Sequence, residues 1–321
     1  MQASTPPTHS RPPFWLWLHL MSLEAPLVSA LWAAGLAKVI RVPLMPGVLW
    51  GLGLSVWMIY VLDRLLDTVG KRDADLDARH LFHRRHQRVF MIAVAVAAVI
   101  TSWLAFWVVP ADLMWHCVML AVPMLFYLAI YTADGSGISF RWLLPLCGVA
   151  TFSLIASAPL KTGFKLSLAV LVTSGLLLLT LKSNQERLRS AMNKDVVGGM
   201  LFALGCTAWS RFIRDGADTV GGFLEFVLLS CLFISNLAGI SAVAGQSRWL
   251  AAGFGAVVGS LALVWRGDVA ESMSALATAC GLGFALLAAL QLLRRHFSTE
   301  LYRVLADVAV ALPVMWLFIR A

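Results

Sequence analysis

Two aspartates one helical turn apart are the residues of this sequence best suited to chemistry. Asp63 and Asp67 lie in the stretch YVLDRLLD, at the end of a long apolar segment. Side chains at positions i and i+4 of a helix share one face, so both carboxylates can reach one ion. Mg²⁺ prefers such oxygen ligands and completes its shell with water or phosphate oxygens. The pair therefore predicts a Mg²⁺ site, and the alternative is a solvated helix end paired to Arg64, Lys71 or Arg72.

A basic segment follows the aspartates, with seven Arg and His residues between positions 79 and 88. Arginine presents a planar fork of donors that matches phosphate oxygens. The segment therefore predicts a diphosphate site, with Arg64, Arg79, His83, Arg84, Arg85 and the more distant Lys194 as its candidate residues. The alternative is a basic segment beside the membrane that sets topology and contacts anionic lipids.

A second polar cluster lies further along the chain and could complete a bipartite site. Its candidate residues are Asn184, Glu186, Arg187, Asp195 and, within a later apolar segment, Asn236. A solvated connection explains most of them equally well. Charged residues inside apolar segments are costly and therefore also informative. Among these, Glu24 is expected in the middle of the first span, facing a cavity, whereas Arg303 and Asp307 are expected to neutralise each other.

The composition requires that these residues be positioned by membrane helices. The chain has 321 residues, of which 60% are hydrophobic and only 13% charged, and its mean hydropathy is +0.81. A soluble protein carries about 25% charged residues. Continuous apolar segments long enough to cross a bilayer recur along the chain. We therefore expect an all-α, polytopic integral membrane helical bundle with nine to eleven transmembrane helices.

Eleven candidate spans account for the apolar segments, and two short ones (141–159 and 165–182) could instead form a re-entrant hairpin. The eleven are 14–37, 44–66, 89–109, 112–131, 141–159, 165–182, 196–213, 221–242, 248–265, 272–293 and 301–319. Residues 1–13 are expected to be a disordered cytoplasmic tail, and 14–321 a single transmembrane domain. Within that domain, 67–88 is expected to be a cytoplasmic polar connection.

Lysine and arginine predict the orientation of the bundle. The N-terminus and the connections after even-numbered spans hold 17 of the 25 Lys and Arg, and the other side holds 8. The side with more Lys and Arg is normally cytoplasmic. This predicts a cytoplasmic N-terminus and an integral membrane protein of a bacterial inner membrane. Topology and membrane lipids explain the net charge of +8, and no nucleic-acid partner is expected.

The two aspartates also resemble a motif of the UbiA superfamily of membrane prenyltransferases. That family carries NxxxDxxxD at the cytoplasmic end of its second span, and Asp63 and Asp67 match its two Asp, with Ile59 in the Asn position. Arg79, Arg84 and Arg85 stand roughly where the family has diphosphate-binding basic residues. The stretch 194–205 resembles the segment entering the family's fifth span.

The resemblance implies a function. It implies transfer of a prenyl group from an isoprenoid diphosphate to a lipophilic acceptor, with Mg²⁺ held by Asp63 and Asp67. The family's second Asp-rich motif is not found, and Asn184, Glu186 and Arg187, or Asn236, stand at the corresponding places.

Other classes of membrane protein remain as alternatives. The residues Asp63-Arg64 and Gly70-Lys71-Arg72 include the ingredients of a transporter motif, although their spacing differs from it. His83 and His86 resemble part of the histidine boxes of di-iron enzymes, which need about eight clustered histidines, more than this face of the chain offers. A non-catalytic protein on a related helical scaffold is the third alternative.

The charge distribution makes a first testable prediction about topology. The connections 67–88 and 183–195 should both be cytoplasmic, because together they are rich in Lys and Arg. Single cysteines placed in either connection of a cysteine-free chain should not react with an impermeant thiol reagent added to intact cells. Reaction at either connection would reverse the side assigned to every candidate residue.

Overall fold

The computed structural model describes residues 14–69, 71–73, 76–132, 162–180, 186–213, 219–241 and 246–320. The predicted tail 1–13, the predicted span 141–159 and Asn184 lie outside these residues. All elements in the described part of the chain are helices. They are α1 (Phe14–Leu20), α2 (Glu24–Val39), α3 (Pro46–Leu66), α4 (Ala78–Arg85), α5 (Gln87–Trp107), α6 (Ala111–Thr132), α8 (Thr162–Thr180), α9 (Glu186–Ile213), α10 (Thr219–Ile240), α11 (Gln246–Trp265), α12 (Ser272–Leu293), the 3-10 turn η3 (Arg294–His296), α13 (Thr299–Ala311) and α14 (Val314–Arg320).

The helices confirm a helical membrane protein. Seven segments of the described residues are long and apolar enough to cross a bilayer: Pro46–Leu66, Gln87–Trp107, Lys194–Ile213, Thr219–Ile240, Gln246–Trp265, Ser272–His296 and Thr299–Arg320. These seven agree with predicted spans to within a few residues. Helices α6 and α8 coincide with two further predicted spans, so the total of nine to eleven stays a prediction.

The prediction that residues 14–37 form one continuous helix is wrong. The chain breaks between α1 and α2, where Ser22 has a left-handed backbone conformation with φ of 57°. This conformation is unfavourable for a residue with a side chain and does not continue a helix. The break places Glu24 in the first turn of α2 instead of the middle of a span, and α1 instead packs against α4 and α13.

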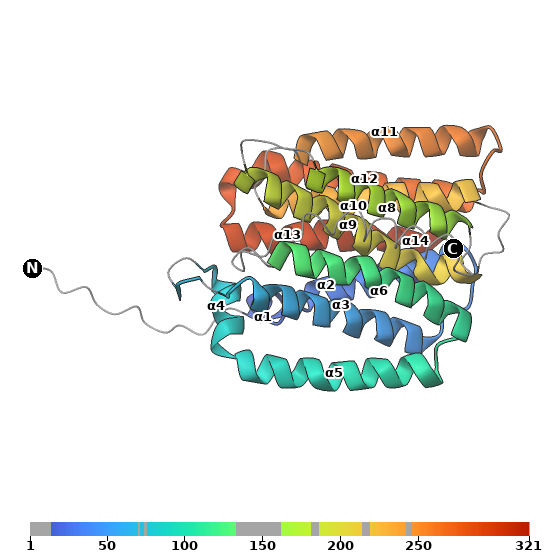
Figure 1. Cartoon of the computed structure of the whole chain (residues 1–321). Helices are drawn as coiled ribbons and strands as arrows, with labels where there is room; N and C mark the ends of the chain where they lie inside the picture. The colour runs from blue at the N-terminus through green and yellow to red at the C-terminus, as the bar shows by residue number, and fades with distance from the viewer. Residues whose placement is uncertain are drawn as a thin grey trace, which may run out of the picture.

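The long helices lie roughly along one axis, as Figure 1 shows. Helices α9 and α10 form the centre of the bundle, and α2, α12 and α13 pack around them. Trp32 on α2 is fully buried, and its indole N–H donates a hydrogen bond to the carbonyl of Val310 at 3.1 Å. Helix α5 lies at the edge, where it packs on α3 and exposes most of its apolar side chains.

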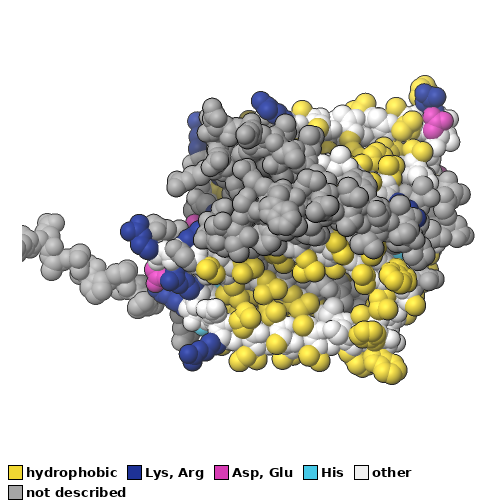
Figure 2. Space-filling view, in the orientation of Figure 1, with side chains coloured by type: hydrophobic (Ala, Val, Ile, Leu, Met, Phe, Trp, Pro, Cys, Tyr) yellow, Lys and Arg dark blue, Asp and Glu magenta, His cyan; other side chains and the backbone are white. Residues whose placement is uncertain are grey.

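The two ends of the bundle differ in their side chains. We call the end that carries α4 the α4 end; it also includes the end of α3 and the beginnings of α5 and α13 (Figure 1). Lys and Arg gather at this end, and hydrophobic side chains cover much of the flank (Figure 2). At the opposite end, large aromatic side chains are exposed, as expected at a membrane interface: Phe106, Trp107 and Trp265.

A close approach of α9 to α10 positions the part of α9 that enters the site. A Cβ on Gly199 would lie 2.8 Å from the backbone nitrogen of Ile234 and 2.6 Å from its Cγ1. A Cβ on the neighbouring Gly198 would meet no atom closer than 3.5 Å. The absence of a side chain at Gly199 therefore permits the contact between these two central helices.

The two glycines supply a second prediction and its control. Gly199→Ala should destabilise the protein by about 1–3 kcal/mol, because backbone atoms of α10 cannot move aside as a flexible side chain can. Gly198→Ala adds the same methyl group in ordinary contact and should be tolerated. Thermal unfolding of both purified variants in detergent would measure the difference. Equal midpoints for the two variants would contradict this account of the α9–α10 contact.

Candidate functional site

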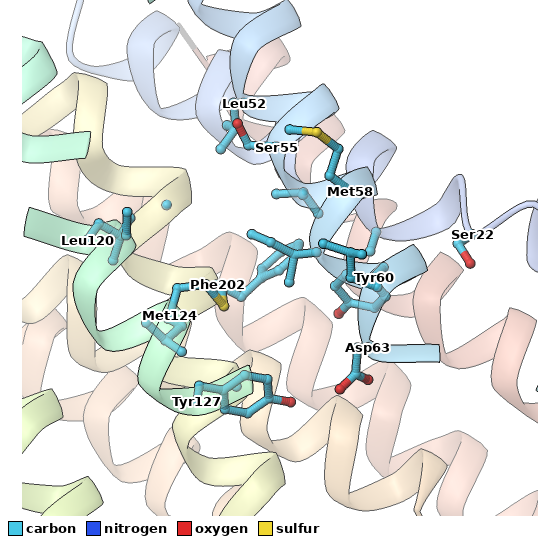
Figure 3. Close-up of a pocket in the computed structure, with 18 of the residues that line it drawn as sticks. Ser22, Leu52, Ser55, Met58, Tyr60, Asp63, Leu120, Met124, Tyr127 and Phe202 are labelled. Carbon is cyan, nitrogen blue, oxygen red and sulfur yellow. The ribbon is translucent and has the colours of Figure 1, made fainter. Parts of the chain in front are cut away.

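A cavity of about 800 Å³ runs between α3, α5, α6 and α9. This volume lies in the range of small-molecule sites, about 300–1,000 Å³. Away from the α4 end, the wall of the cavity is mostly apolar. Its residues there include Leu49, Leu52, Leu104, Leu113 and Met114. At the α4 end the wall is polar. Figure 3 shows that Asp63, Tyr60 and Tyr127 face the same space from α3 and α6.

Lys194 joins the two predicted aspartates at this polar end. Its Nζ lies 2.8 Å from Oδ1 of Asp63 and 3.0 Å from Oδ2 of Asp67. The two carboxylates face the same way because they are one turn apart on α3. Lys194 comes from α9, so a single ammonium group bridges two helices that are distant in sequence.

His80 on α4 is a second partner for Asp67, with its Nε2 3.8 Å from Oδ2. Burial raises the pKa of Asp67, but the interactions with His80 and Lys194 outweigh burial and lower it to about 2. Asp67 is therefore ionised across the physiological range. The side chains of Asp63 and Asp67 are 22% and 24% exposed, so both remain accessible from the cavity.

Arg64 and Arg79 line the same polar end and have hydrogen-bond donors without partners in the described residues. Arg64 is only 7% exposed, and its Nη1 is one such donor. The Nε of Arg79 is another. Burial lowers the pKa of Arg79 to about 10, and the charges of Arg64 and Arg303 add to this effect. A buried donor without a partner is unfavourable, and both donor atoms are closed off from solvent. The two guanidinium groups nevertheless add positive charge to the cavity wall, which favours an anion at this end.

The other predicted basic residues do not line the cavity. His83 is fully buried, stacks on Phe90 with ring centroids 4.2 Å apart and contacts the Ser22 hydroxyl at 3.2 Å. Burial lowers its pKa to about 4, so the ring is neutral near pH 7. Arg84 pairs with Asp73 at 3.2 Å, and Arg85 is exposed. Of the basic segment, the structure thus brings only Arg79 and His80 to the cavity.

The second predicted cluster is divided by the structure. Asp195 lines the cavity and accepts a hydrogen bond from the Ser241 hydroxyl at 3.0 Å. Asn236 donates to Oδ1 of Asp307 at 2.9 Å. Glu186 and Arg187 belong to the first turn of α9, and their side chains lie outside the described residues, as does Asn184.

Three further ionisable residues line the polar end, and only Glu24 among them was expected to face a cavity. His19 lines the cavity and lies 2.7 Å from the carboxylate of Glu24, which also lines it. Asp307 lines it as well, and its predicted neutralisation by Arg303 is wrong, because Arg303 turns to Glu300 at 3.1 Å and Asp77 at 2.8 Å. Their positions as ionisable groups in apolar segments are the only sequence signal of their role.

The described residues contain no group of three or more His, Cys, Asp or Glu side chains that could hold a metal ion. A metal at Asp63 and Asp67 would therefore take its remaining ligands from water or from a bound anion. No family model, curated protein or solved structure matches this chain. The geometry of the cavity is therefore the basis for any functional proposal.

The bridge made by Lys194 supplies a third prediction. The lowered pKa of Asp67 corresponds to about 2 kcal/mol of stability, present above its ordinary pKa and lost as the pH falls through about 2. Lys194→Gln removes one of the cations responsible and leaves two carboxylates one turn apart. The variant should unfold at a lower temperature than wild type at about pH 7, and the deficit should narrow toward about pH 4 as the carboxyls take up protons.

Arg88→Gln is the matched control, since it removes one positive charge from an exposed side chain at the same end of the bundle. Its unfolding midpoint should follow that of wild type across this pH range. If the unfolding midpoint of Lys194→Gln also equals that of wild type across this pH range, the bridge does not stabilise the fold.

Proposed function

We propose that this chain is a UbiA-like membrane prenyltransferase. It binds a prenyl diphosphate in the cavity and transfers the prenyl group to a lipophilic acceptor held beside it. The diphosphate lies at the α4 end, among Arg64, Arg79 and Lys194, and the isoprenoid chain lies along the apolar wall. The single observation that carries the proposal is the continuity of one cavity from a charged end to a long apolar end.

The shape and polarity of the cavity match an amphipathic lipid better than a soluble metabolite. Apolar side chains from α3, α5 and α6 line most of its length, and burying an isoprenoid against them is favourable. The charged residues are confined to the α4 end. A ligand with one anionic headgroup and one apolar chain would satisfy both regions at once.

The positive charges of Arg64 and Arg79 on the cavity wall support an anionic headgroup at that end. Charge-assisted hydrogen bonds from arginine to phosphate oxygens are short and strong. Lys194 can release one carboxylate and reach a phosphate oxygen, because its four-carbon side chain is flexible. These three cations would hold the leaving group while Tyr60 and Tyr127 border the space in which the prenyl carbon becomes exposed to the acceptor.

Asp63 and Asp67 would hold Mg²⁺ in this proposal. Two accessible carboxylates on one face are a donor set that fits the ion, and phosphate oxygens would complete its shell. When bound, the ion would neutralise negative charge on the departing diphosphate. Lys194 contacts the same oxygens, so the ion and the ammonium group compete for them.

The bridge by Lys194 also favours a second candidate function. A lysine that neutralises both aspartates can hold an anionic lipid without any metal, as in a non-catalytic lipid-binding protein. In both candidates we place the α4 end in the cytoplasm of a bacterial inner membrane, on the distribution of Lys and Arg.

Binding of geranylgeranyl diphosphate to the full chain in detergent tests the proposal. Wild type should bind it more tightly with Mg²⁺ than with a chelator. Asp63→Asn and Asp67→Asn should abolish the difference, and Arg64→Gln should weaken binding about tenfold to a hundredfold under both conditions, by loss of a charge-assisted bond. The matched control is Arg84→Gln with Arg85→Gln, which removes two arginines outside the cavity and should leave binding unchanged.

Diphosphate release in the presence of phenolic and quinol acceptors then separates the two candidates. Release that requires Asp63, Asp67 and Mg²⁺ supports the transferase. Metal-independent binding without release supports the lipid-binding protein. No binding of the prenyl diphosphate by wild type under any of these conditions would exclude the transferase.

A further inference from the structure

A chain of ionisable side chains connects the cavity to the surface at the α4 end. Asp307 and Glu24 both line the cavity, and their carboxyl groups lie within hydrogen-bonding reach of each other. The Nδ1 of His19 lies 2.7 Å from Oε2 of Glu24, and its Nε2 lies 3.2 Å from Oε2 of Glu300. The order Asp307, Glu24, His19, Glu300 therefore leads from the cavity outward.

Exposure to solvent is greatest at the last member of this series. The side chains of Glu24 and His19 are 11% and 2% exposed, whereas that of Glu300 is 28% exposed. Glu300 is also held by Arg303, which continues to the more exposed Asp77. The series of side chains thus begins at the cavity wall and ends at Glu300 and Asp77, which are the more exposed of its members.

The carboxyl groups of Glu24 and Asp307 are close enough for like charges to repel strongly. One proton shared between two carboxyl groups at hydrogen-bonding distance would remove this repulsion. The groups that face the pair are His19 from α1, Tyr60 and Arg64 from α3, Asn236 from α10 and Glu300 from α13. Asn236 donates a hydrogen bond to Oδ1 of Asp307 at 2.9 Å, which restrains that carboxyl group.

Histidine is suited to the middle position because it can take a proton on one ring nitrogen and release one from the other. Burial lowers the pKa of His19, but hydrogen bonds to Glu24 and Glu300 outweigh burial and raise it. The ring is therefore readily protonated between the two carboxylates. The imidazole ring can therefore pass a proton from Glu24 to Glu300 while the side chain stays in place.

We propose that Glu24 and Asp307 accept a proton released in the cavity and that His19 and Glu300 carry it to the surface. For its chemistry the inference rests on the proposed prenyl transfer. In that reaction the bond between the prenyl carbon and the diphosphate oxygen breaks, and its electron pair leaves with the diphosphate. A bond forms between the prenyl carbon and the acceptor, and the acceptor's proton goes to the carboxyl pair. The pair already holds one proton and one negative charge, so it becomes neutral until His19 removes a proton.

Infrared difference spectroscopy of the full-length protein tests the shared proton without any substrate. Wild type should show the carbonyl band of a protonated, buried carboxylic acid, and Asp307→Asn or Glu24→Gln should abolish it. Asp307→Glu retains a carboxyl and should restore a band. Asp268→Asn, which alters an exposed carboxylate paired with Arg266, is the matched control and should leave the band unchanged. Retention of the full band in both Asp307→Asn and Glu24→Gln would overturn the proposal.

Exchange into heavy water tests the path. The band should shift rapidly in wild type and more slowly in His19→Phe, which removes both ring nitrogens. Equal rates of exchange would exclude His19 as the relay.

Turnover tests the role of the pair in the reaction. Asp307→Asn should lower turnover about a hundredfold while leaving geranylgeranyl diphosphate binding unchanged. Full turnover in Asp307→Asn and Glu24→Gln would overturn the role as proton acceptor. A wild type without turnover would refute the proposed transferase, and the infrared band alone would then decide whether the proton chain exists.

Discussion

A charged side chain inside a membrane protein requires a partner, and this requirement organises the space between α3 and α9. The two helices contact each other little along most of their length. At the α4 end, Lys194 on α9 bridges Asp63 and Asp67 on α3. At the opposite end, the indole of Trp209 on α9 donates to the carbonyl of Pro43, just before α3, at 3.1 Å. The cavity lies between these two attachments, so its width depends on them.

The α4 end of the cavity holds charged groups of both signs among the described residues. Lys194 bridges Asp63 and Asp67, His19 contacts Glu24, and Ser241 donates to Asp195. Within the described part of the chain, buried oxygens of Glu24 and Asp195 still lack a hydrogen-bond partner, as do buried nitrogens of Arg64 and Arg79. A buried polar atom without a partner is costly. An anion would satisfy the donors, and a cation or a proton would satisfy the acceptors.

The sequence predicts the long helices well because hydropathy alone determines where a segment can cross a bilayer. It also predicts that Asp63 and Asp67 share a face, because helical periodicity is a local property. The partner of this pair lies 127 residues away in the chain, and no local pattern connects Lys194 to it. The break at Ser22 does have a local signal, since Pro26 is tolerated in the first turn of a helix and Ser22 and Glu24 interrupt the apolar segment. The positions of Glu24 and His19 relative to Asp307 depend on long-range packing and could not be predicted.

The basic segment shows the same limit within one short helix. Arg79, His83 and Arg84 are close in sequence, yet α4 turns Arg79 toward the cavity, His83 into the protein and Arg84 toward Asp73. Charge density identifies the segment as a site of anion contact but does not identify which side of the helix faces the ligand. That choice depends on how α4 packs on α1 and α3. Only the three-dimensional packing reduces the predicted set to the residues at the cavity.

Arg64 links the two functions proposed for the polar end. It lines the cavity, and its charge also acts on the carboxyl groups of Glu24 and Asp307. An anionic headgroup that engages Arg64 would weaken the field that this cation exerts on the carboxyl pair. A weaker positive field favours the protonated form of the pair, so headgroup binding and proton uptake would promote each other. Because the coupling is reciprocal, the pair would be best able to release its proton through His19 once the anion has left.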